Sequence, residues 1–337
     1  MSRIAVLGAT GHVGTFLIPR LVRTGHDVVA VSRGLREPYH PDEAWSSVQR
    51  VALDRDALAD AFPAAVAELK ADVVVDMTCF TRESAEQLVV ALRGQTALLL
   101  HCGTIWVHGH SSVVPTTEAD HRGPFGEYGT GKAEIEDLLL DEAARADGLR
   151  CVVLRPGHIT GPGWPMINAV GNLDLDVWHR LATGQPVDMP NFGQETVHHV
   201  HADDVAQAFQ LALEQPDVAA GNAYNVVSER AMTLRGIATA VAGWFGREAD
   251  LRFMPFEQFR AGTDSEAADA SWEHIVRSHS MSIDKARQQL GYSPRYTSLQ
   301  AIADGLAWLA ERGEVDLGGD AVAILRANSM DGRTGVR

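Results

Sequence analysis

The stretch Gly8-Ala9-Thr10-Gly11-His12-Val13-Gly14 decides the fold of this 337-residue chain. It follows an apolar run at residues 4–7 and precedes a segment with helical spacing at residues 13–23, so it joins a strand to a helix. Glycines let a backbone turn sharply and approach a pyrophosphate closely, and the helix start offers unpaired N–H groups. The stretch therefore predicts a dinucleotide-binding unit, although three glycines can also form a purely structural turn.

The first half of the chain alternates short apolar strands with longer helical segments. We predict strands at residues 4–7, 28–31, 48–51, 73–76, 97–101 and 151–154, and helices at residues 13–23, 57–69, 83–92 and 129–146. Apolar strands separated by helices are typical of a parallel sheet covered on both faces. The pattern predicts an α/β fold, a Rossmann-type doubly wound parallel sheet with a smaller C-terminal substrate-binding lobe.

A loop crowded with proline and glycine follows residue 157 and marks a predicted domain boundary. We predict a nucleotide-binding Rossmann domain over residues 1–157 and a mixed substrate-binding lobe over 158–312, with some segments returning to the first domain. The stretch 313–337 is polar and glycine-rich, so we expect a loosely packed tail there.

Composition and charge point to a small molecule as the partner. The net charge of −15 argues against general binding to nucleic acid or to anionic membranes. The sequence shows no signal-peptide pattern and no apolar run long enough to span a bilayer, so we expect a cytoplasmic protein. The three cysteines are too scattered for a disulfide framework, and no third ligand accompanies the histidines at 198–201, so we expect no metal site.

Tyr128 and Lys132 are four residues apart where the predicted helix 129–146 begins, and this spacing places them on one helix face. A phenol with a pKa of about 10 is a poor base at neutral pH, but a neighbouring ammonium group lowers that pKa. The pair therefore predicts an acid/base group for a substrate hydroxyl or carbonyl. By itself such a pair is also a common feature of amphipathic surface helices.

Several longer motifs match one family pattern over about residues 3–310. They are the GxxGxxG spacing of the glycine loop, the strand and turn at 98–109, the Leu-Arg-Pro loop at 154–163, the His-Ala-Asp-Asp-Val-Ala run at 201–206, and Lys285-Ala286 followed by Leu-Gly-Tyr-Ser-Pro at 290–294. Together they make the chain resemble the extended short-chain dehydrogenase/reductase family, the NAD(P)-dependent epimerase/dehydratase group.

The resemblance implies a catalytic trio. Thr104 stands at the position of the family's serine, where a hydroxyl hydrogen-bonds the reacting oxygen. Tyr128 would transfer the proton, and Lys132 would tune it and orient the cofactor ribose. The cofactor-binding residues implied are Gly8, Thr10, Gly11, His12, Val13, Gly14, Ser32, Arg33, Asp54, Met77, Thr78, Tyr128, Lys132, Pro156, Gly157, His158 and Ile159.

Substrate contacts are expected from Phe80, Thr104, Ile105, Trp106 and His158, although aromatic and imidazole groups at these positions could equally belong to the core.

The end of the second predicted strand favours NADP over NAD. A carboxylate there would bind the ribose hydroxyls of NAD, but the chain has Ser32 and Arg33, with Arg36 close behind, and these suit a 2′-phosphate. Asp54 matches an adenine-contacting aspartate of the family, and Asp54 or Asp56 can also cap a helix, so that both roles can hold together. We therefore predict NADP, with NAD as the alternative.

The chain departs from the family pattern where nucleotide sugars and dehydration are handled. Ile105 and Trp106 replace the acidic residue of sugar dehydratases, residues 195–198 lack an expected phosphate-binding arginine, and Arg277 is the only candidate for a second one. We expect an NAD(P)-dependent oxidoreductase or epimerase that transfers hydride at a carbinol or ketone carbon of a sugar-like or polyhydroxylated metabolite. The alternatives are a nucleotide-sugar epimerase with retained NAD and a non-catalytic dinucleotide-sensing module.

A homodimer is expected by analogy with the family, which pairs the helices corresponding to residues 83–92 and 129–146. Ile135, Leu138 and Leu139 recur at helical spacing and need a partner surface, which the chain's own sheet could also supply.

Overall fold

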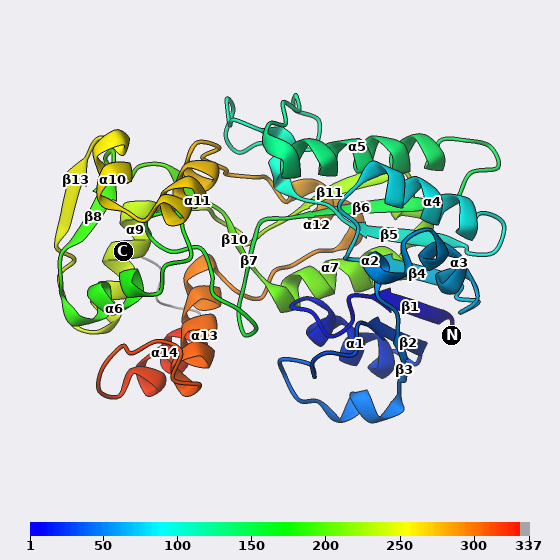
Figure 1. The fold of residues 1–337 in the computed structure, drawn as a ribbon, viewed down its shortest axis with the longest axis horizontal. Coiled ribbons are helices and arrows are strands. Elements are labelled where there is room, and N and C mark those ends of the chain that lie inside the picture. The colour runs from blue at the N-terminus through cyan, green and yellow to red at the C-terminus, as the bar shows by residue number, and fades with distance from the viewer. Residues whose placement is uncertain (331–337) are drawn as a thin grey trace.

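A seven-stranded parallel sheet forms the centre of the computed structural model, which describes residues 1–330 (Figure 1). The spatial order is β11-β6-β5-β4-β1-β2-β3. The strands are β1 (Arg3–Leu7), β2 (Asp27–Ser32), β3 (Gln49–Ala52), β4 (Val73–Asp76), β5 (Leu98–Cys102), β6 (Cys151–Pro156) and β11 (Asn222–Val226). The order reverses between β1 and β4, which is where such sheets bind ligands at their carboxyl ends. The predicted Rossmann-type fold is confirmed.

Helices cover both faces of this sheet (Figure 1). One face carries α1 (Gly14–Arg23), α7 (Ala202–Glu214) and α12 (Asp284–Leu290), and the other carries α3 (Phe62–Ala67), α4 (Arg82–Leu92) and α5 (Gly126–Ala143). Side chains alternate between the two faces along a strand, so Ile4 and Val6 join the first hydrophobic core while Ala5 and Leu7 join the second. Continuous apolar strands are therefore buried on both sides.

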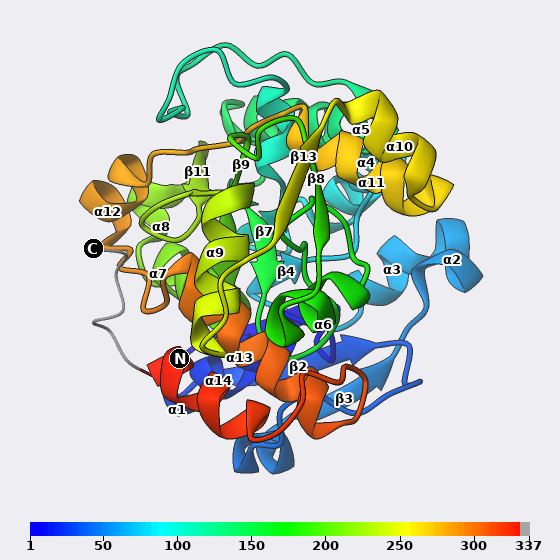
Figure 2. The ribbon, with the colours of Figure 1, turned by 90° about the vertical axis from the view of Figure 1, so that its left-hand side faces the viewer.

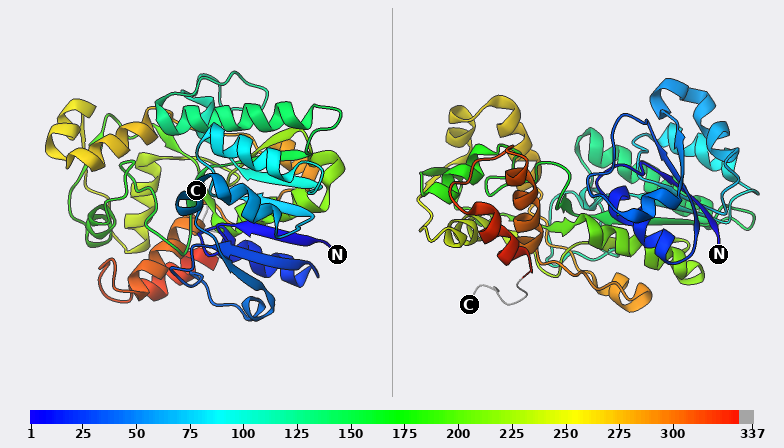
Figure 3. Two further views of the ribbon diagram at one scale, coloured as in Figure 1. Left: turned by 45° about the vertical axis from the view of Figure 1, so that its right-hand side comes forward. Right: turned by 90° about the horizontal axis from the view of Figure 1, so that it is seen from below.

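The second lobe lies beside the carboxyl edge of the sheet and has its own hydrophobic core (Figures 2 and 3). Its strands form three pairs: β7 (His158–Thr160) with β10 (His199–His201), β9 (Thr196–Val197) with β12 (Met232–Thr233), and β8 (Val187–Pro190) with β13 (Leu251–Met254). Its helices are α6 (Asp176–Thr183), α9 (Leu234–Trp244), α10 (Phe256–Gly262), α11 (Ser265–Ile275), α13 (Ser298–Glu311) and α14 (Ala321–Met330).

Short elements complete the fold: η1 (Glu43–Ser47), α2 (Arg55–Leu58), η2 (Ala59–Ala61), η3 (Ile105–His108) and α8 (Pro216–Ala219). The helix predicted at 57–69 is wrong as one element, because the chain forms α2, η2 and α3 there. Pro63 lies in the first turn of α3, where its missing N–H is tolerated, and it would interrupt a longer helix.

The end of the described chain also differs from its prediction. Residues 321–330 form α14 instead of a loose tail, and Ala321 and Leu325 are buried against the core of the second lobe. Arg326 adds ion pairs to Glu311 and Asp304 on α13. The helix therefore docks through an apolar face, and residues 331–337 of the predicted tail lie outside the described residues.

Over residues 1–330, none of the helices combines the length and apolar character needed to cross a membrane.

Candidate active site

The glycine loop follows β1 at the carboxyl edge of the sheet, and its backbone leaves no room for side chains. Gly8 has a φ of 91°, which favours glycine, and its carbonyl accepts a hydrogen bond of 2.9 Å from the Gly11 amide. A Cβ atom on Gly14 would lie 2.3 Å from the Ala9 carbonyl oxygen. The cradle predicted from the sequence is therefore present as a tight turn that admits only glycine at this position.

The start of α1 faces this loop and suits an anion. Within residues 1–330 no side chain caps the helix at Val13, and its first turn contains no acidic residue. The amide groups and the positive end of the helix dipole are thus available for a pyrophosphate. Thr78 and Met77 line the same loop, since a Cβ on Gly8 would lie 2.9 Å from Thr78 Cγ2 and 3.6 Å from Met77 Cβ. The residues fit a bound dinucleotide.

The side chain of His12 contacts the second lobe and does not face the predicted pyrophosphate site. Its ring is buried, its Nε2 lies 3.1 Å from the Gly161 carbonyl oxygen, and it packs edge-on against Trp164 with ring centroids 4.1 Å apart. Burial lowers the pKa of His12 to about 3, so the imidazole is neutral. His12 joins the glycine loop to the second lobe.

The end of β2 carries the groups predicted to choose between the two dinucleotides. Ser32 accepts a hydrogen bond of 3.2 Å from the Gly34 amide, and Arg33 is exposed. Arg36 donates to the Tyr39 hydroxyl and lies over its ring, 4.8 Å from the centroid. A cation is thus held near the end of β2.

Asp54 follows β3 and caps α2, because its carboxylate accepts hydrogen bonds from the amides of Asp56 (3.0 Å) and Ala57 (3.2 Å). The predicted capping role of Asp54 is confirmed, and its contact with adenine stays a prediction.

The structure brings the three predicted catalytic residues together. Thr104 caps η3, where its hydroxyl accepts a hydrogen bond of 3.3 Å from the Trp106 amide, and it lies near enough to the Tyr128 hydroxyl to lower the pKa of that phenol. Tyr128 lies in the first turn of α5 and Lys132 follows one turn later. The hydroxyl and the phenol therefore meet at the carboxyl end of β5.

The pKa of Tyr128 differs from the one predicted from the sequence. Although 44% of the Tyr128 surface is exposed, loss of water around its hydroxyl raises its pKa to about 12. Lys132 does not oppose this effect with a direct contact, because its Nζ donates to the carbonyl oxygens of Cys79 and Cys102, both at 2.8 Å. Burial lowers the pKa of Lys132. The predicted lowering of the Tyr128 pKa is wrong for this arrangement, since desolvation raises this pKa by more than the nearby Thr104 hydroxyl lowers it.

Two of the predicted substrate contacts flank Tyr128. The Trp106 ring meets it edge-on at 5.4 Å, and the Phe80 ring lies 6.5 Å from it and 4.6 Å from Lys132 Nζ. Ile105 is fully buried in the hydrophobic core instead, so its prediction as a substrate contact is wrong. The turn of η3 sends neighbouring side chains to opposite sides.

The segment after β6 crosses tightly into the second lobe. Pro156 pairs with Val226 of β11, and Gly157 donates its amide to the Val226 carbonyl oxygen at 3.0 Å. A Cβ on Gly157 would lie 2.2 Å from the His198 carbonyl oxygen. Ile159 packs partly buried against the first hydrophobic core.

His158 begins β7 and belongs to a histidine cluster that the sequence analysis missed. Its ring centroid lies 5.2 Å from that of His274 and 5.8 Å from that of His199. Burial lowers the pKa values of all three, to about 4 for His199 and His274, so these rings are neutral at pH 7. The β7–β10 register places His199 opposite His158, and no local pattern reveals that pairing.

Arg277 is enclosed and unavailable to a phosphate group. Its guanidinium donates to the Glu273 carboxylate (2.7 Å) and the Phe125 carbonyl oxygen (3.0 Å), and it lies between the rings of Trp106 and Phe125. None of its surface is exposed. The second phosphate-binding arginine considered in the sequence therefore has a structural role.

No group of three or more histidine, cysteine, aspartate or glutamate side chains within the described part of the chain could hold a metal ion.

A glycine loop on a doubly wound sheet, with a threonine, a tyrosine and a lysine gathered beside it, defines a nucleotide-binding protein of the Rossmann class. The model of the NAD dependent epimerase/dehydratase family matches residues 4–226. The chain belongs to this family, and the predictions of the family and of an NAD(P)-dependent enzyme of this type are confirmed.

Individual proteins resemble the chain at low sequence identity. The chain is 26% identical to the chloroplast stem-loop binding protein of 41 kDa b from Arabidopsis thaliana, over 90% of this chain and 78% of that protein. It is 28% identical to 2′-dehydrokanamycin reductase from Streptomyces kanamyceticus, over 76% and 70%. The solved structure of the Bordetella bronchiseptica enzyme WbmG in complex with NAD and UDP superposes with a TM-score of 0.69 at 18% identity, over 95% and 97%, which shows the shared fold.

Proposed function

We propose that this protein is an NAD(P)-dependent oxidoreductase that transfers hydride at a carbinol or ketone carbon of a sugar-like or polyhydroxylated metabolite. The observation that carries this proposal is the convergence of Thr104, Tyr128 and Lys132 at the carboxyl edge of the sheet, next to the glycine loop. The nicotinamide of a bound dinucleotide would supply the hydride chemistry.

Tyr128, Thr104 and Lys132 have separate roles in this reaction. Tyr128 holds its proton at neutral pH because its pKa is about 12, so it can donate that proton to a carbonyl oxygen that becomes an alcohol. Thr104 holds the same oxygen through its hydroxyl. Lys132 keeps its ammonium group between two carbonyl oxygens beneath Tyr128, from which it can reach a cofactor ribose. This arrangement supports the reductive direction, while an epimerase would use the same groups in both directions.

NADP is the proposed cofactor, with NAD as the alternative. Ser32 replaces a carboxylate at the end of β2, and Arg33 with Arg36 supplies the positive charge that a 2′-phosphate needs. The glycine loop, with Met77 and Thr78 beside it, would hold the pyrophosphate.

An uncharged substrate fits the site better than a nucleotide sugar. Arg277 is already bound by Glu273 and two aromatic rings, and the rings of His158, His199 and His274 are neutral. A diphosphate would meet no free cation in this group of side chains. The relative from Streptomyces kanamyceticus is named as a reductase of 2′-dehydrokanamycin, and this name mentions no nucleotide.

The non-catalytic alternative has support from one relative, whose name describes a stem-loop binding protein. The net charge of −15 and the assembled Thr104, Tyr128 and Lys132 favour the enzyme. The homodimer stays a prediction. Ile135 and Leu139, which suggested it, are buried against the chain's own sheet, so sedimentation must decide it.

The test follows NADPH and NADH absorbance with a panel of sugar-derived ketones, and compares Tyr128→Phe with Tyr296→Phe. Loss of the Tyr128 hydroxyl should lower turnover by about 10²–10⁴-fold, because the proton donor is removed. Tyr296 stacks on His201 through its ring, so its variant should keep full activity.

Equal turnover in Tyr128→Phe and wild type would reject this mechanism, and substrate conversion without net change in the cofactor would indicate an epimerase. Tight binding of UDP-glucose would favour the nucleotide-sugar alternative.

A further inference from the structure

Glu136 lies on α5 one turn beyond Lys132 and is completely buried. Two arginines neutralise its carboxylate. Arg155 Nε donates to it at 2.8 Å, with a second bond from Arg155 Nη2, and Arg122 Nη1 donates at 2.6 Å. A buried carboxylate without such partners is strongly disfavoured, so the geometry of the group is tightly constrained.

Arg155 extends this contact to two further segments. Its Nη1 lies 3.1 Å from His108 Nε2, and since a guanidinium can only donate, the neutral imidazole accepts. His108 ends η3, the turn that Thr104 caps, and Arg155 lies directly before Pro156, the first of the predicted cofactor-binding residues 156–159.

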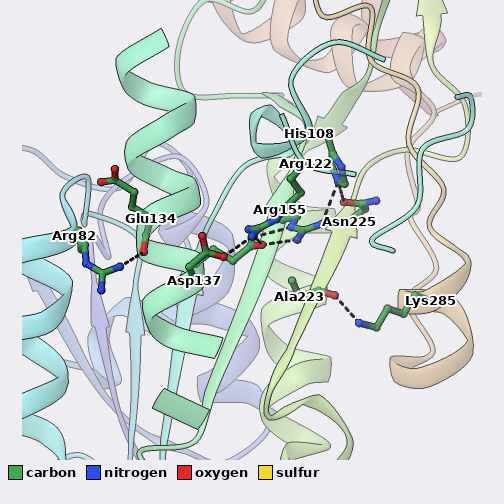
Figure 4. Close-up of polar contacts among 10 residues, drawn as sticks. Arg82, His108, Arg122, Glu134, Asp137, Arg155, Ala223, Asn225 and Lys285 are labelled. Atoms are coloured by element: carbon green, nitrogen blue, oxygen red, sulfur yellow. Dashed lines mark hydrogen bonds and ion pairs between the residues drawn. The ribbon is translucent and has the colours of Figure 1, made fainter. Parts of the chain in front are cut away.

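His108 also lies close to β11 at the edge of the sheet. His108 Nε2 also lies 3.4 Å from Asn225 Oδ1 on β11, but both atoms are acceptors while Arg155 donates to His108, so this is a packing contact and not a hydrogen bond. The backbone N–H of Asn225 donates to the Glu118 carboxylate at 2.7 Å. Figure 4 shows Arg122, Arg155, His108 and Asn225 converging beside α5. One ionic cluster, defined as Glu136 with Arg122, Arg155 and His108, thus connects elements that are far apart in the sequence.

We propose that Glu136 is a positioning residue for the catalytic trio: through Arg155 and His108 it holds α5, the Thr104 turn and the Pro156–Gly157 crossing in one fixed relation. The inference rests on the proposed function. Glu136 contacts neither Tyr128 nor Lys132. Because all three residues lie on the same helix, anchoring α5 at Glu136 also fixes the positions of Tyr128 and Lys132. Misplacement of reacting groups by about 1 Å can cost on the order of 100-fold in rate.

Glu142 on the same helix offers a matched control. Its buried carboxylate receives two hydrogen bonds from Arg93, at 2.9 and 2.7 Å, and one from the Leu149 amide at 2.8 Å. Both residues are thus buried, arginine-paired carboxylates of α5, and they differ in which segments they connect. Glu142 connects α5 to the end of α4 and to the approach to β6, away from the trio.

The experiment compares hydrogen–deuterium exchange of the full chain in wild type, Glu136→Gln and Glu142→Gln. Glu136→Gln should accelerate exchange by about 10-fold in three segments together, residues 103–109, 126–133 and 157–160, because their common anchor is lost. Glu142→Gln should leave these three segments within about threefold of wild type and accelerate residues 93–96 and 142–149. If Glu136→Gln does not fold, Glu136→Asp keeps the charge, shortens the reach and should show a weaker form of the same pattern.

The proposal is wrong if Glu136→Gln or Glu136→Asp changes exchange in α5 alone, or if Glu142→Gln loosens the same three segments. In the turnover assay, Glu136→Gln should lower kcat by about 10–100-fold while NADPH affinity stays within about threefold. Failure of the proposed function would appear as absent turnover in wild type and would leave the exchange result unaffected.

Discussion

Gly14 lies where the backbone leaves no space for a side chain. A Cβ there would lie 2.3 Å from the Ala9 carbonyl oxygen, so Gly14→Ala must displace the glycine loop from its contact with the start of α1. We expect dinucleotide affinity to fall by at least about 10-fold, because the amides at the helix start are no longer aligned. Fluorescence titration with NADPH measures this.

Gly243 supplies the comparison, since it lies inside α9 with open space where a Cβ would be. Gly243→Ala should keep affinity and raise the free energy of unfolding by about 0.5–1 kcal/mol. Unchanged affinity in Gly14→Ala would show that the tight turn is not needed for binding.

Residues that stand beside each other in the sequence can have opposite roles. Thr104 and Trp106 face the site, whereas Ile105 between them belongs to the core. Similarly, the spacing of Tyr128 and Lys132 predicted their common helix face correctly, but not the pKa, since burial of the phenol is a property of its three-dimensional surroundings.

At the scale of elements, α14 is anchored by its apolar face. Leu325 is completely buried in the hydrophobic core of the second lobe, while Met330 at the helix end is 78% exposed. Leu325→Ala should lower the free energy of unfolding by about 2–4 kcal/mol, because it removes buried methyl groups and leaves a cavity.

Met330→Ala should change the free energy of unfolding by less than about 0.5 kcal/mol. Urea denaturation followed by circular dichroism measures both variants. Equal, small effects would mean that α14 does not contribute to the core of the second lobe.

Buried histidines determine how the stability of the whole molecule changes at acidic pH. The histidines with lowered pKa values are His12, His101, His108, His158, His198, His199, His274 and His279. Between pH 6.5 and about 4 the unfolded chain binds protons at these positions and the folded chain does not. Stability should therefore fall as the pH drops below 6.5, by up to about 1.4 kcal/mol per pH unit for each histidine.

Asp204 acts in the opposite direction, because burial raises its pKa to about 6 and its protonation favours the folded chain in part of the same range. Urea denaturation at pH 7.5, 6.0 and 5.0 measures the net effect. His279→Gln, which can retain the contact to the Gly109 carbonyl oxygen, should reduce the pH dependence by about one proton. Constant stability over this range would contradict the expected dependence.

By itself, the sequence determined the sheet, the glycine loop and the Tyr128–Lys132 face, because these depend on apolar periodicity, glycine spacing and the helix period, which are all local. The resemblance of residues 98–109 to the family pattern also indicated Thr104. Only the tertiary structure decided that Arg277 is enclosed, that His158 meets His199 and His274, and that Glu136 reaches Arg155 and His108. Those contacts join residues distant in the chain, and burial, which sets their charge states, exists only once the elements have packed together.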